Sequence, residues 1–238
     1  MSTPAKFVEW PCPDTDDPAA GGGTRAEAGL VFDGGRDARL MIIPPLFEEA
    51  NKLRHTLVEV LRRLDAAGID GILPDLPGCN ESLAPLAKQT LGGWRAGAAA
   101  AAEHFRATAV LTIRGGALLR PPGLPGWDYS PLDGAKVLRS MIRARLIAGK
   151  EAGAQEMREE IETLGRSEGA TLAGWQLGPQ MFAALEQAEL PPREDGVALI
   201  EQETIGGRPP WLRAEPDYDP KQADAIAAII AMAMRPAA

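Results

Sequence analysis

The sequence predicts an α/β fold built around a mainly parallel β-sheet, and three observations support this class. Residues 37–45 (DARLMIIPP) contain a continuous apolar run, which is typical of a strand buried on both faces of a parallel sheet. Similar buried strands are expected at residues 68–75 and 107–113, each after a helical segment. A β-α-β-α-β order of this kind forms a parallel sheet with right-handed crossovers.

The length and composition of the chain predict one large domain. Its 238 residues are 45% hydrophobic, which is enough for a sizeable core, so we expect residues 1–238 to form a single domain. The net charge of −8 argues against a nucleic-acid partner and against attraction to anionic membranes, since both need a basic surface.

Cysteine usage and the apolar stretches predict a cytoplasmic protein without a cofactor. The two cysteines, Cys12 and Cys79, show no disulfide framework and no zinc-ligand spacing, so no metal site is expected. The first residues lack the basic and apolar regions of a signal peptide. Charges or prolines interrupt every apolar stretch well short of a membrane span.

Two short strands are expected before the first buried one. They are residues 6–10 (KFVEW) and 29–35 (GLVFDGG), joined by a loop rich in glycine, proline and aspartate. After Pro45 the apolar positions follow the spacing of one helix face, and Gly68 is expected to end that helix. An alanine-rich helix is expected at about residues 90–106.

The second half of the chain predicts a helical insertion. Residues 135–166 have the composition of a helix with one apolar face, and another helix is expected at residues 179–188. Strand candidates at residues 171–177 and 197–203 flank that second helix. We therefore expect a cap-like insertion at about residues 135–188.

The strand at residues 107–113 runs into the segment TIRGG (residues 112–116, here called the elbow), in which Thr112 stands at the first small position and Gly116 at the last. In α/β-hydrolases the turn after such a strand has the pattern G-x-nucleophile-x-G and is followed by a helix. The pattern refines the predicted fold class to an α/β-hydrolase-type, mainly parallel sheet with helices on both faces and a helical cap. Arg114 stands at the nucleophile position, and a helix is expected from Ala117. A guanidinium stays protonated and cannot attack a carbonyl carbon.

The general base of that chemistry is also missing from the sequence. The catalytic histidine of this fold follows the nucleophile along the chain. The two histidines here, His55 and His104, both precede Arg114. Ordinary Ser-His-Asp hydrolysis is therefore not expected.

Six segments of the sequence resemble one protein family. They are PPLFEEANKLR (44–54), DLPGCNES (75–82), IRGGALL (113–119), SPLDGAKVLRSMIRARL (130–146), AGWQLGPQMFAAL (173–185) and PPWLRAEPDYDP (209–220). These segments resemble the exosortase A system-associated hydrolases, most of all the type 2 branch, which tends to carry arginine at the elbow. The similarity covers most of the chain from about residue 38 onward.

The resemblance implies an α/β-hydrolase fold and a role beside the exopolysaccharide and protein-sorting functions of Gram-negative bacteria. Members of this family carry the name hydrolase, but the resemblance implies no particular substrate. The residues that the matched motifs carry over are Pro45, Glu48, Glu49, Asn51, Arg54, Asp75, Cys79, Ser82, Arg114 and Asp133.

Three interpretations of Arg114 follow from its charged surroundings in the sequence. If Arg114 projects into the crevice beside Glu48 and Glu49, one of these carboxylates should meet it in a bidentate pair. The pair could be a purely structural contact that replaces the usual site. Alternatively, Arg114 could hold an anionic ligand such as a phosphate, uronate or carboxylate, or Glu48 and Glu49 could act as an acid/base pair.

Three further polar residues are weaker candidates. Cys79 follows a buried strand at the end where such sheets place ligands, but no nearby histidine would activate it, so a buried packing role is favoured. Ser82 is expected to cap the next segment rather than to act as a nucleophile. Asp133 is expected to cap the helix that begins near Ala135.

Three functions remain open at this point. The leading one is a binding or accessory protein whose crevice holds a small anionic ligand. Its expected partner is a second copy of the chain, in a homodimer, or another protein of the same pathway. The second is a true hydrolase acting on an ester, thioester or acyl-glycan through Cys79 or Ser82. The third is a structural partner with a closed crevice. The residues expected to line the crevice are Pro45, Glu48, Glu49, Arg54, Cys79 and Arg114.

Overall fold

The structure is a computed structural model of the chain, and it describes residues 3–15, 23–153, 155–213, 215 and 217–234. A single seven-stranded sheet forms the centre of the molecule, with the strand order β1-β2-β4-β3-β5-β6-β9. Five neighbouring strands, from β4 to β9 in this order, are parallel, and β2 is antiparallel to both of its neighbours. The predicted α/β class with a mainly parallel sheet is therefore confirmed.

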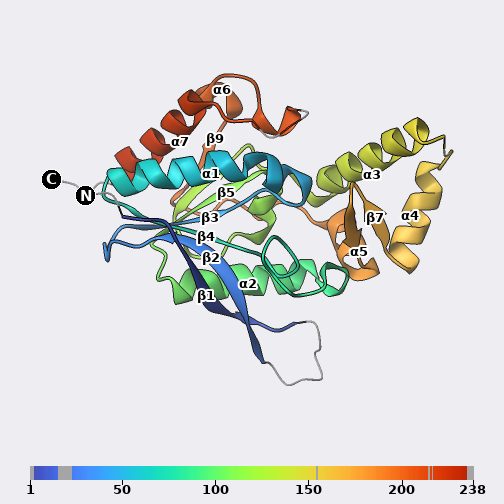
Figure 1. Ribbon diagram of the computed structural model, residues 1–238, viewed down its shortest axis with the longest axis horizontal. Helices are drawn as coiled ribbons and strands as arrows, with labels where there is room; N and C mark the ends of the chain where they lie inside the picture. Colours follow the sequence, from blue (N-terminus) through green and yellow to red (C-terminus); the bar gives the residue numbers. More distant parts are fainter. Residues whose placement is uncertain (1–2, 16–22, 154, 214, 216, 235–238) are drawn as a thin grey trace.

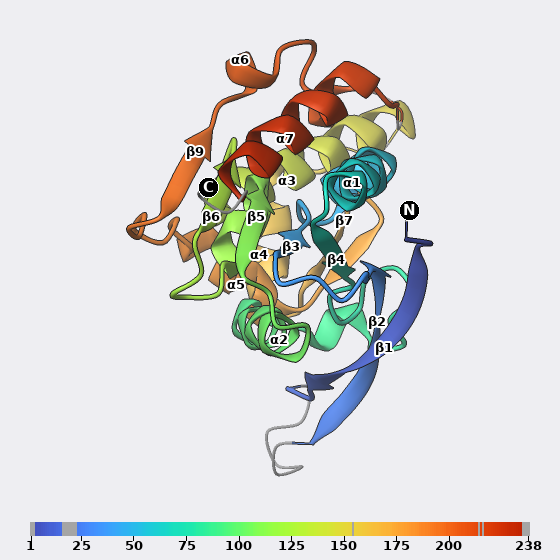
Figure 2. The ribbon, with the colours of Figure 1, turned by 90° about the vertical axis from the view of Figure 1, so that its left-hand side faces the viewer.

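The strands of the large sheet differ in length, and the longest two lie at one edge. Figure 2 shows β1 and β2 at one side of the molecule and β9 at the other. The strands are β1 (Lys6–Pro13), β2 (Thr24–Phe32), β3 (Arg39–Ile43), β4 (Asp70–Pro74), β5 (Ala109–Ile113), β6 (Gly126–Tyr129) and β9 (Val197–Ile200).

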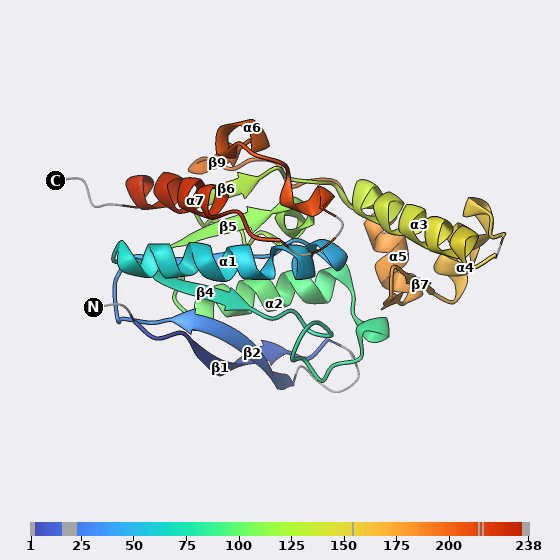
Figure 3. The ribbon, with the colours of Figure 1, turned by 45° about the horizontal axis from the view of Figure 1, so that its top comes forward.

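Helices cover both faces of the sheet. Helices α1 and α7 pack together over one face, and α2 lies on the opposite face (Figures 1 and 3). Among the described residues, no helix combines the length and the apolar character that crossing a membrane requires. The helices are α1 (Glu48–Ala66), α2 (Leu91–His104), α3 (Gly134–Glu151), α4 (Arg158–Ser167), α5 (Pro179–Gln187), α6 (Gln202–Ile205) and α7 (Pro220–Ala233), and the 3₁₀ turns are η2 (Leu86–Lys88), η3 (Arg114–Leu119) and η4 (Pro210–Leu212).

Strand β3 shows why the apolar run in the sequence has no polar alternation. Leu40 and Ile42 point into the core under α1 and α7, whereas Met41 and Ile43 point into the core under α2. All four side chains are at most 1% exposed. A strand buried on both faces must be apolar at every position, as the sequence predicted.

An insertion of three helices and one hairpin lies between β6 and β9. It consists of α3, α4, α5 and a separate two-stranded sheet of β7 (Ala170–Leu172) and β8 (Trp175–Leu177). In Figure 1 its helices project from the right-hand side of the body. Its inner side chains, among them Val137 and Phe182, belong to the same core cluster as Trp94 of α2, so the insertion packs directly on the body.

The structure departs from several sequence-based expectations. The second strand begins at Thr24 rather than at residue 29, because it extends along β1 as a long antiparallel ribbon. Part of the predicted loop, residues 16–22, lies outside the described residues. The single helix expected at residues 135–166 is two helices, and residues 171–177 form a hairpin through Ala173-Gly174 rather than one strand.

We expect Gly116 to be required by the close approach of η3 to the end of β3. A Cβ atom at this position would lie 2.4 Å from the Pro44 carbonyl oxygen and 2.8 Å from that of Ile43. Because backbone atoms cannot rotate away, Gly116→Ala should lower the free energy of unfolding by roughly 2–3 kcal/mol in urea denaturation. Gly92→Ala on α2 meets no atom closer than 3.9 Å and should be neutral or stabilising. Equal effects of the two substitutions would contradict this account.

Candidate functional site

Strained backbone gathers at the edge of the sheet where the parallel strands end. Four residues with positive φ follow four neighbouring strands: Phe47 (56°) after β3, Asn80 (51°) after β4, Arg114 (54°) after β5 and Ser130 (44°) after β6. Such φ values are unfavourable for residues other than glycine. They are found most often at active sites and ligand-binding sites. The same edge is where open α/β sheets bind ligands.

Arg114 lies at the elbow, directly after β5, and its guanidinium meets a carboxylate of α1. Its Nε donates to Glu49 Oε2 at 3.1 Å, and its Nη2 donates to Glu49 Oε1 at 3.2 Å. Its Nη1 donates to the carbonyl oxygen of Ser130 at 3.3 Å. The expected contact of Arg114 with one of the two glutamates is thus present as a bidentate pair, and each guanidinium nitrogen has a partner.

An aromatic ring covers the flat face of the same guanidinium. The Cζ atom of Arg114 lies 4.3 Å from the ring centroid of Trp211 in η4, a cation–π contact. Trp211 in turn packs edge-on against Tyr129, with the ring centroids 5.5 Å apart. The side chains of Arg114 and Glu49 are only 14% and 22% exposed. We call Arg114, Glu49, Ser130 and Trp211 the elbow clasp.

A second ion pair ties α1 to the neighbouring strand. Arg54 Nη1 donates to Asp75 Oδ1 at 2.8 Å, directly after β4, and Asn80 Nδ2 donates to the same oxygen at 2.8 Å. The Asp75 side chain is fully buried. Helix α1 is therefore fixed to β5 through Glu49 and to β4 through Arg54, on either side of β3.

The space over the elbow is filled by apolar side chains. A Cβ atom on Gly115 would lie 2.9 Å from Val137 Cγ2 and 3.1 Å from Leu46 Cγ, so these two side chains cover the residue after Arg114. The hollow beside Glu49 measures about 30 Å³ and is lined by Leu46, Phe47, Glu48, Glu49, Val137, Ser140 and Met141. This volume corresponds to about one water molecule and cannot hold an ester.

The elbow also lacks the helix that follows the nucleophile in active members of this architecture. The segment expected to begin a helix at Ala117 is the six-residue 3₁₀ turn η3, which ends before Pro121-Pro122. A buried ion pair closes this shortened connection, since Arg120 Nη2 lies 3.1 Å from Asp128 Oδ2 on β6. Thr112 Oγ1 donates to Asp128 Oδ1 at 2.6 Å, so Asp128 joins the elbow to β6.

The two histidines lie away from Arg114. His55 is an exposed residue of α1 whose ring stacks on Tyr218, with the centroids 4.6 Å apart. His104 is the last residue of α2 and lines a hollow with Arg39 and Asp70, which begin their strands at the opposite edge of the sheet. The structure therefore brings no histidine to the elbow.

Cys79 and Ser82 are placed as structural residues in the loop after β4. Burial raises the pKa of the Cys79 thiol to about 12, and the negative charges of Asp75 and Glu27 act in the same direction. Ser82 Oγ accepts hydrogen bonds from the amides of Gly78 and Ala84 and donates to Glu27 Oε1 at 2.9 Å. The Cys79 thiolate is thus disfavoured, and the lone pairs of Ser82 Oγ are engaged by two backbone amides, as expected of a residue that holds the loop.

The other motif residues occupy separate places. Glu48 does not reach Arg114; it is 46% exposed and pairs with Lys52 one turn further along α1, at 2.8 Å. Pro45 is buried behind β3, and Asn51 is exposed on α1. Asp133 caps α3 by accepting from the Lys136 amide at 2.8 Å, as expected.

Sequence reasoning did not find Trp211, Ser130, Asp128 or Arg120 as parts of this edge. Trp211 lies within the segment PPWLRAEPDYDP that carries the family resemblance, which was the one available signal. The other three contacts depend on how β5, β6 and η3 lie next to each other. Within the described part of the chain, no three His, Cys, Asp or Glu side chains converge as a metal site would require.

Comparisons with known proteins show which solved structures share this fold. No protein-family model matches the chain, and no curated protein matches it. A solved structure from Agrobacterium vitis, named as a hydrolase, superposes with a TM-score of 0.52 at 14% identity and covers 97% of this chain and 99% of that chain. A hypothetical protein from Pseudomonas aeruginosa superposes with a TM-score of 0.53 at 10% identity, covering 84% of this chain and 78% of the other. Mouse α/β hydrolase domain-containing protein 10 gives 0.48 at 14% identity, covering 84% and 77%. The chain has the α/β-hydrolase fold.

Removal of the Glu49 charge should destabilise the protein. Glu49→Gln leaves a largely buried guanidinium without its counter-ion, so we expect the free energy of unfolding to fall by roughly 1–3 kcal/mol in urea denaturation. Glu48→Gln is the matched control, because Glu48 forms only an exposed pair with Lys52 and should change stability by less than about 0.5 kcal/mol. Similar losses in both variants would show that Arg114 does not depend on Glu49.

The Cys79 thiol should be unreactive in the folded protein. With a pKa near 12, almost none of it is thiolate at pH 8, so iodoacetamide should modify it far more slowly than a free thiol. The measurement uses the Cys12→Ala variant, in which Cys79 is the remaining cysteine, and follows the mass increase with time. Unfolding in guanidinium chloride should restore rapid modification. Fast modification of the folded variant would contradict the burial argument.

Proposed function

We propose that this chain is a non-hydrolysing member of the α/β-hydrolase fold that works as an accessory protein through its surface. The observation that carries the proposal is the elbow clasp. The nucleophile position holds Arg114, and Glu49 binds its edge while Trp211 covers its face. A side chain held on three sides is suited to joining α1, β5 and β6 and not to attacking a substrate.

Three independent features support the absence of standard hydrolysis. An arginine replaces the nucleophile, and no histidine lies beside it. Leu46 and Val137 pack against Gly115, the residue whose amide would contribute to the oxyanion hole in this fold. The residue replacement, the missing base and the packed oxyanion-hole residue are separate changes, and each of them would slow the reaction by orders of magnitude.

The two other functions have less support from this geometry. An anion held by Arg114 would have to displace the Glu49 carboxylate from both of its hydrogen bonds, and the hollow beside Glu49, at about 30 Å³, is too small for such a ligand. Hydrolysis through Cys79 would need a thiolate where burial favours the thiol, and hydrolysis through Ser82 would need a free lone pair on an oxygen that already accepts two amide hydrogen bonds.

We also propose, from the motifs, that the accessory role belongs to an exopolysaccharide and protein-sorting system in the cytoplasm. The support for this is that the segments resembling the exosortase-associated family contain the residues of the two ion pairs that join α1 to the ends of β4 and β5. Glu49 and Arg54 come from the first of these segments, and Arg114 and Asp75 come from two others. A protein partner or a second copy of the chain belongs to the same proposal.

Hydrolysis assays test the central claim. The purified chain is incubated with p-nitrophenyl acetate, p-nitrophenyl butyrate and an acyl thioester, and turnover should equal that of heat-denatured protein. A fluorophosphonate probe should leave the protein unlabelled. Turnover at least tenfold above this background, lost in Ser82→Ala or Cys79→Ala, would overturn the proposal in favour of an unconventional hydrolase.

Thermal unfolding separates the accessory role from anion binding at the elbow. Inorganic phosphate and glucuronate at 10 mM should change the Tm by less than about 1 °C, because a ligand raises stability only if it binds the folded state. A rise of several degrees that disappears in Arg114→Lys would show that Arg114 binds anions. That result would replace the closed-crevice account with a ligand-binding function.

A further inference from the structure

The exposed charges of the surface helices are arranged in two different ways. In α1, Glu48 pairs with Lys52 at 2.8 Å and Glu59 pairs with Arg63 at 2.8 Å. In α4, Glu162 lies 3.8 Å from Arg158, one turn before it, and 3.6 Å from Arg166, one turn after it. These helices neutralise their own charges through partners three or four residues away, which is the usual arrangement on a solvated face.

Helix α3 is different because it has almost no acidic residues. Its 18 residues contain five cations, and its one acid is the last residue, Glu151. Two of the cations have internal partners, since Lys136 pairs with Asp133 and Arg145 pairs with Glu156. Arg139, Arg143 and Lys150 form neither a hydrogen bond nor an ion pair with any described residue.

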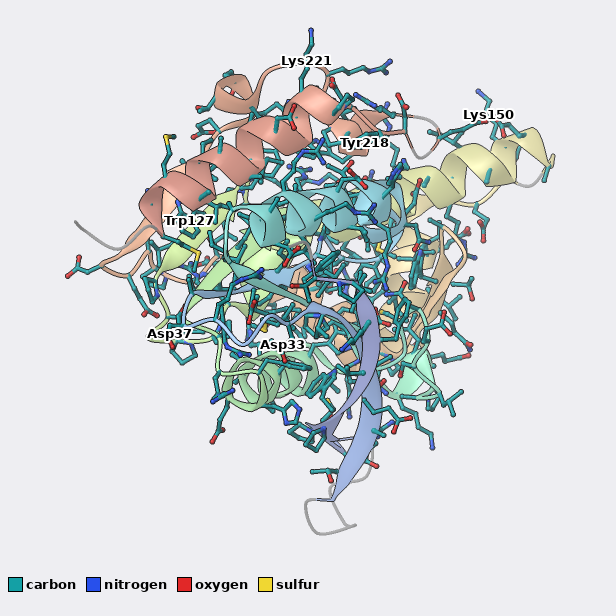
Figure 4. The ribbon with its side chains drawn as sticks, turned by 60° about the vertical axis from the view of Figure 1, so that its left-hand side comes forward. Asp33, Asp37, Trp127, Lys150, Tyr218 and Lys221 are labelled. Carbon is teal, nitrogen blue, oxygen red and sulfur yellow. The ribbon has the colours of Figure 1, made fainter. Side chains whose placement is uncertain are left out.

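The unpaired cations lie on one outward face of α3. Arg139, Arg143, Ile147 and Lys150 follow each other at intervals of four, four and three residues, so they form one stripe along the helix. The opposite face, which includes Val137 and Met141, is buried against the body. All four stripe residues are exposed, and Ile147 is 50% exposed. Figure 4 shows Lys150 pointing away from the body at the outer end of α3.

The α3 stripe (Arg139, Arg143, Ile147 and Lys150) is about as long as a short helical segment of a partner protein. At 1.5 Å per residue the stripe spans about 17 Å, which is about three turns of a partner helix. It presents three positive charges around one apolar side chain, on a protein whose net charge is −8. Acidic side chains that could repel a partner lie near its first end, where Glu186 and Glu189 line a hollow with Lys136 and Arg139.

We propose that the α3 stripe binds an acidic protein segment that carries an apolar side chain. Charge complementarity supplies the attraction to Arg139, Arg143 and Lys150, and Ile147 packs against the apolar residue of the partner. The inference goes beyond the proposed accessory function and is argued only from the charges, exposure and spacing of the α3 residues. It does not require that the elbow be inactive.

A protein segment fits these residues better than the other anionic partners. A membrane-binding helix needs a broad apolar face, whereas the stripe exposes one apolar side chain. A single-stranded nucleic acid is bound through aromatic side chains that stack on its bases, and α3 contains no aromatic residue. The overall negative charge opposes both of these large polyanions.

The test measures binding of a designed peptide to the full-length chain by fluorescence anisotropy. The probe is a fluorescein-labelled helical 16-mer with one leucine and four glutamates on the face that complements the stripe. It should bind the wild-type chain, and the same peptide with lysine in place of glutamate should bind at least fivefold more weakly. Raising the salt from 50 to 300 mM should weaken binding of the acidic peptide several-fold, because exposed charges are screened.

Charge-reversal variants identify the surface that binds. Arg139→Glu with Arg143→Glu should weaken binding about tenfold, and Ile147→Asp should weaken it about threefold. The conservative pair Arg139→Lys with Arg143→Lys should retain binding within about twofold. Lys88→Glu with Lys221→Glu is the matched control, because it makes the same change in net charge at exposed sites on η2 and α7. Figure 4 shows Lys221 projecting from the start of α7.

Several outcomes would overturn the proposal. One is equal binding of the acidic and basic peptides, and another is a loss of affinity in the control pair as large as in the stripe variants. Tighter binding of vesicles with 30% phosphatidylserine, or of single-stranded RNA, than of the peptide would assign the stripe to those partners instead. Esterase turnover would overturn the proposed function and leave the peptide result unchanged, so the two failures are distinguishable.

Discussion

The bidentate contact between Arg114 and Glu49 is the interaction on which the carboxyl edge of the sheet depends. The elbow holds Arg114 at a φ of 54°, which directs its side chain out of the sheet. A cation in a mostly buried position needs an opposite charge, and α1 provides it at 3.1 and 3.2 Å. With the Arg54–Asp75 pair, this contact fixes the start of α1 over the ends of β4, β3 and β5.

This contact gives the elbow a structural task at the position where the fold usually places a nucleophile. The turn still places one residue at the focal point of the sheet, and here that residue holds elements together. Leu46 and Val137 then pack over Gly115, and the following helix is reduced to η3. On the outer surface α3 differs from α1 and α4, because Arg139, Arg143 and Lys150 have no ion-pair partner among the acids of their own helix.

The fold was predictable because burial leaves a direct mark on the sequence. The run Leu40–Ile43 is apolar at each position since alternate side chains enter different halves of the core. The stripe of leucines in α1 similarly marks the one face that packs on the sheet. The break between α3 and α4 and the hairpin of β7 and β8 were missed. In those segments short-range patterns allow several structures. The packing of α3 and α4 against α5 and the pairing of β7 with β8 decide among them.

By itself, the sequence determined the class of fold, the elbow at residues 112–116, and the absence of a nucleophile and a following histidine, because these are properties of residue type and order. It also limited the partner of Arg114 to Glu48 or Glu49. Only the tertiary structure chose Glu49, added Trp211 and Ser130, and filled the crevice with Leu46 and Val137. The physical reason is that these contacts join residues from 16 to 97 positions apart, and their geometry exists only after the strands and helices have packed.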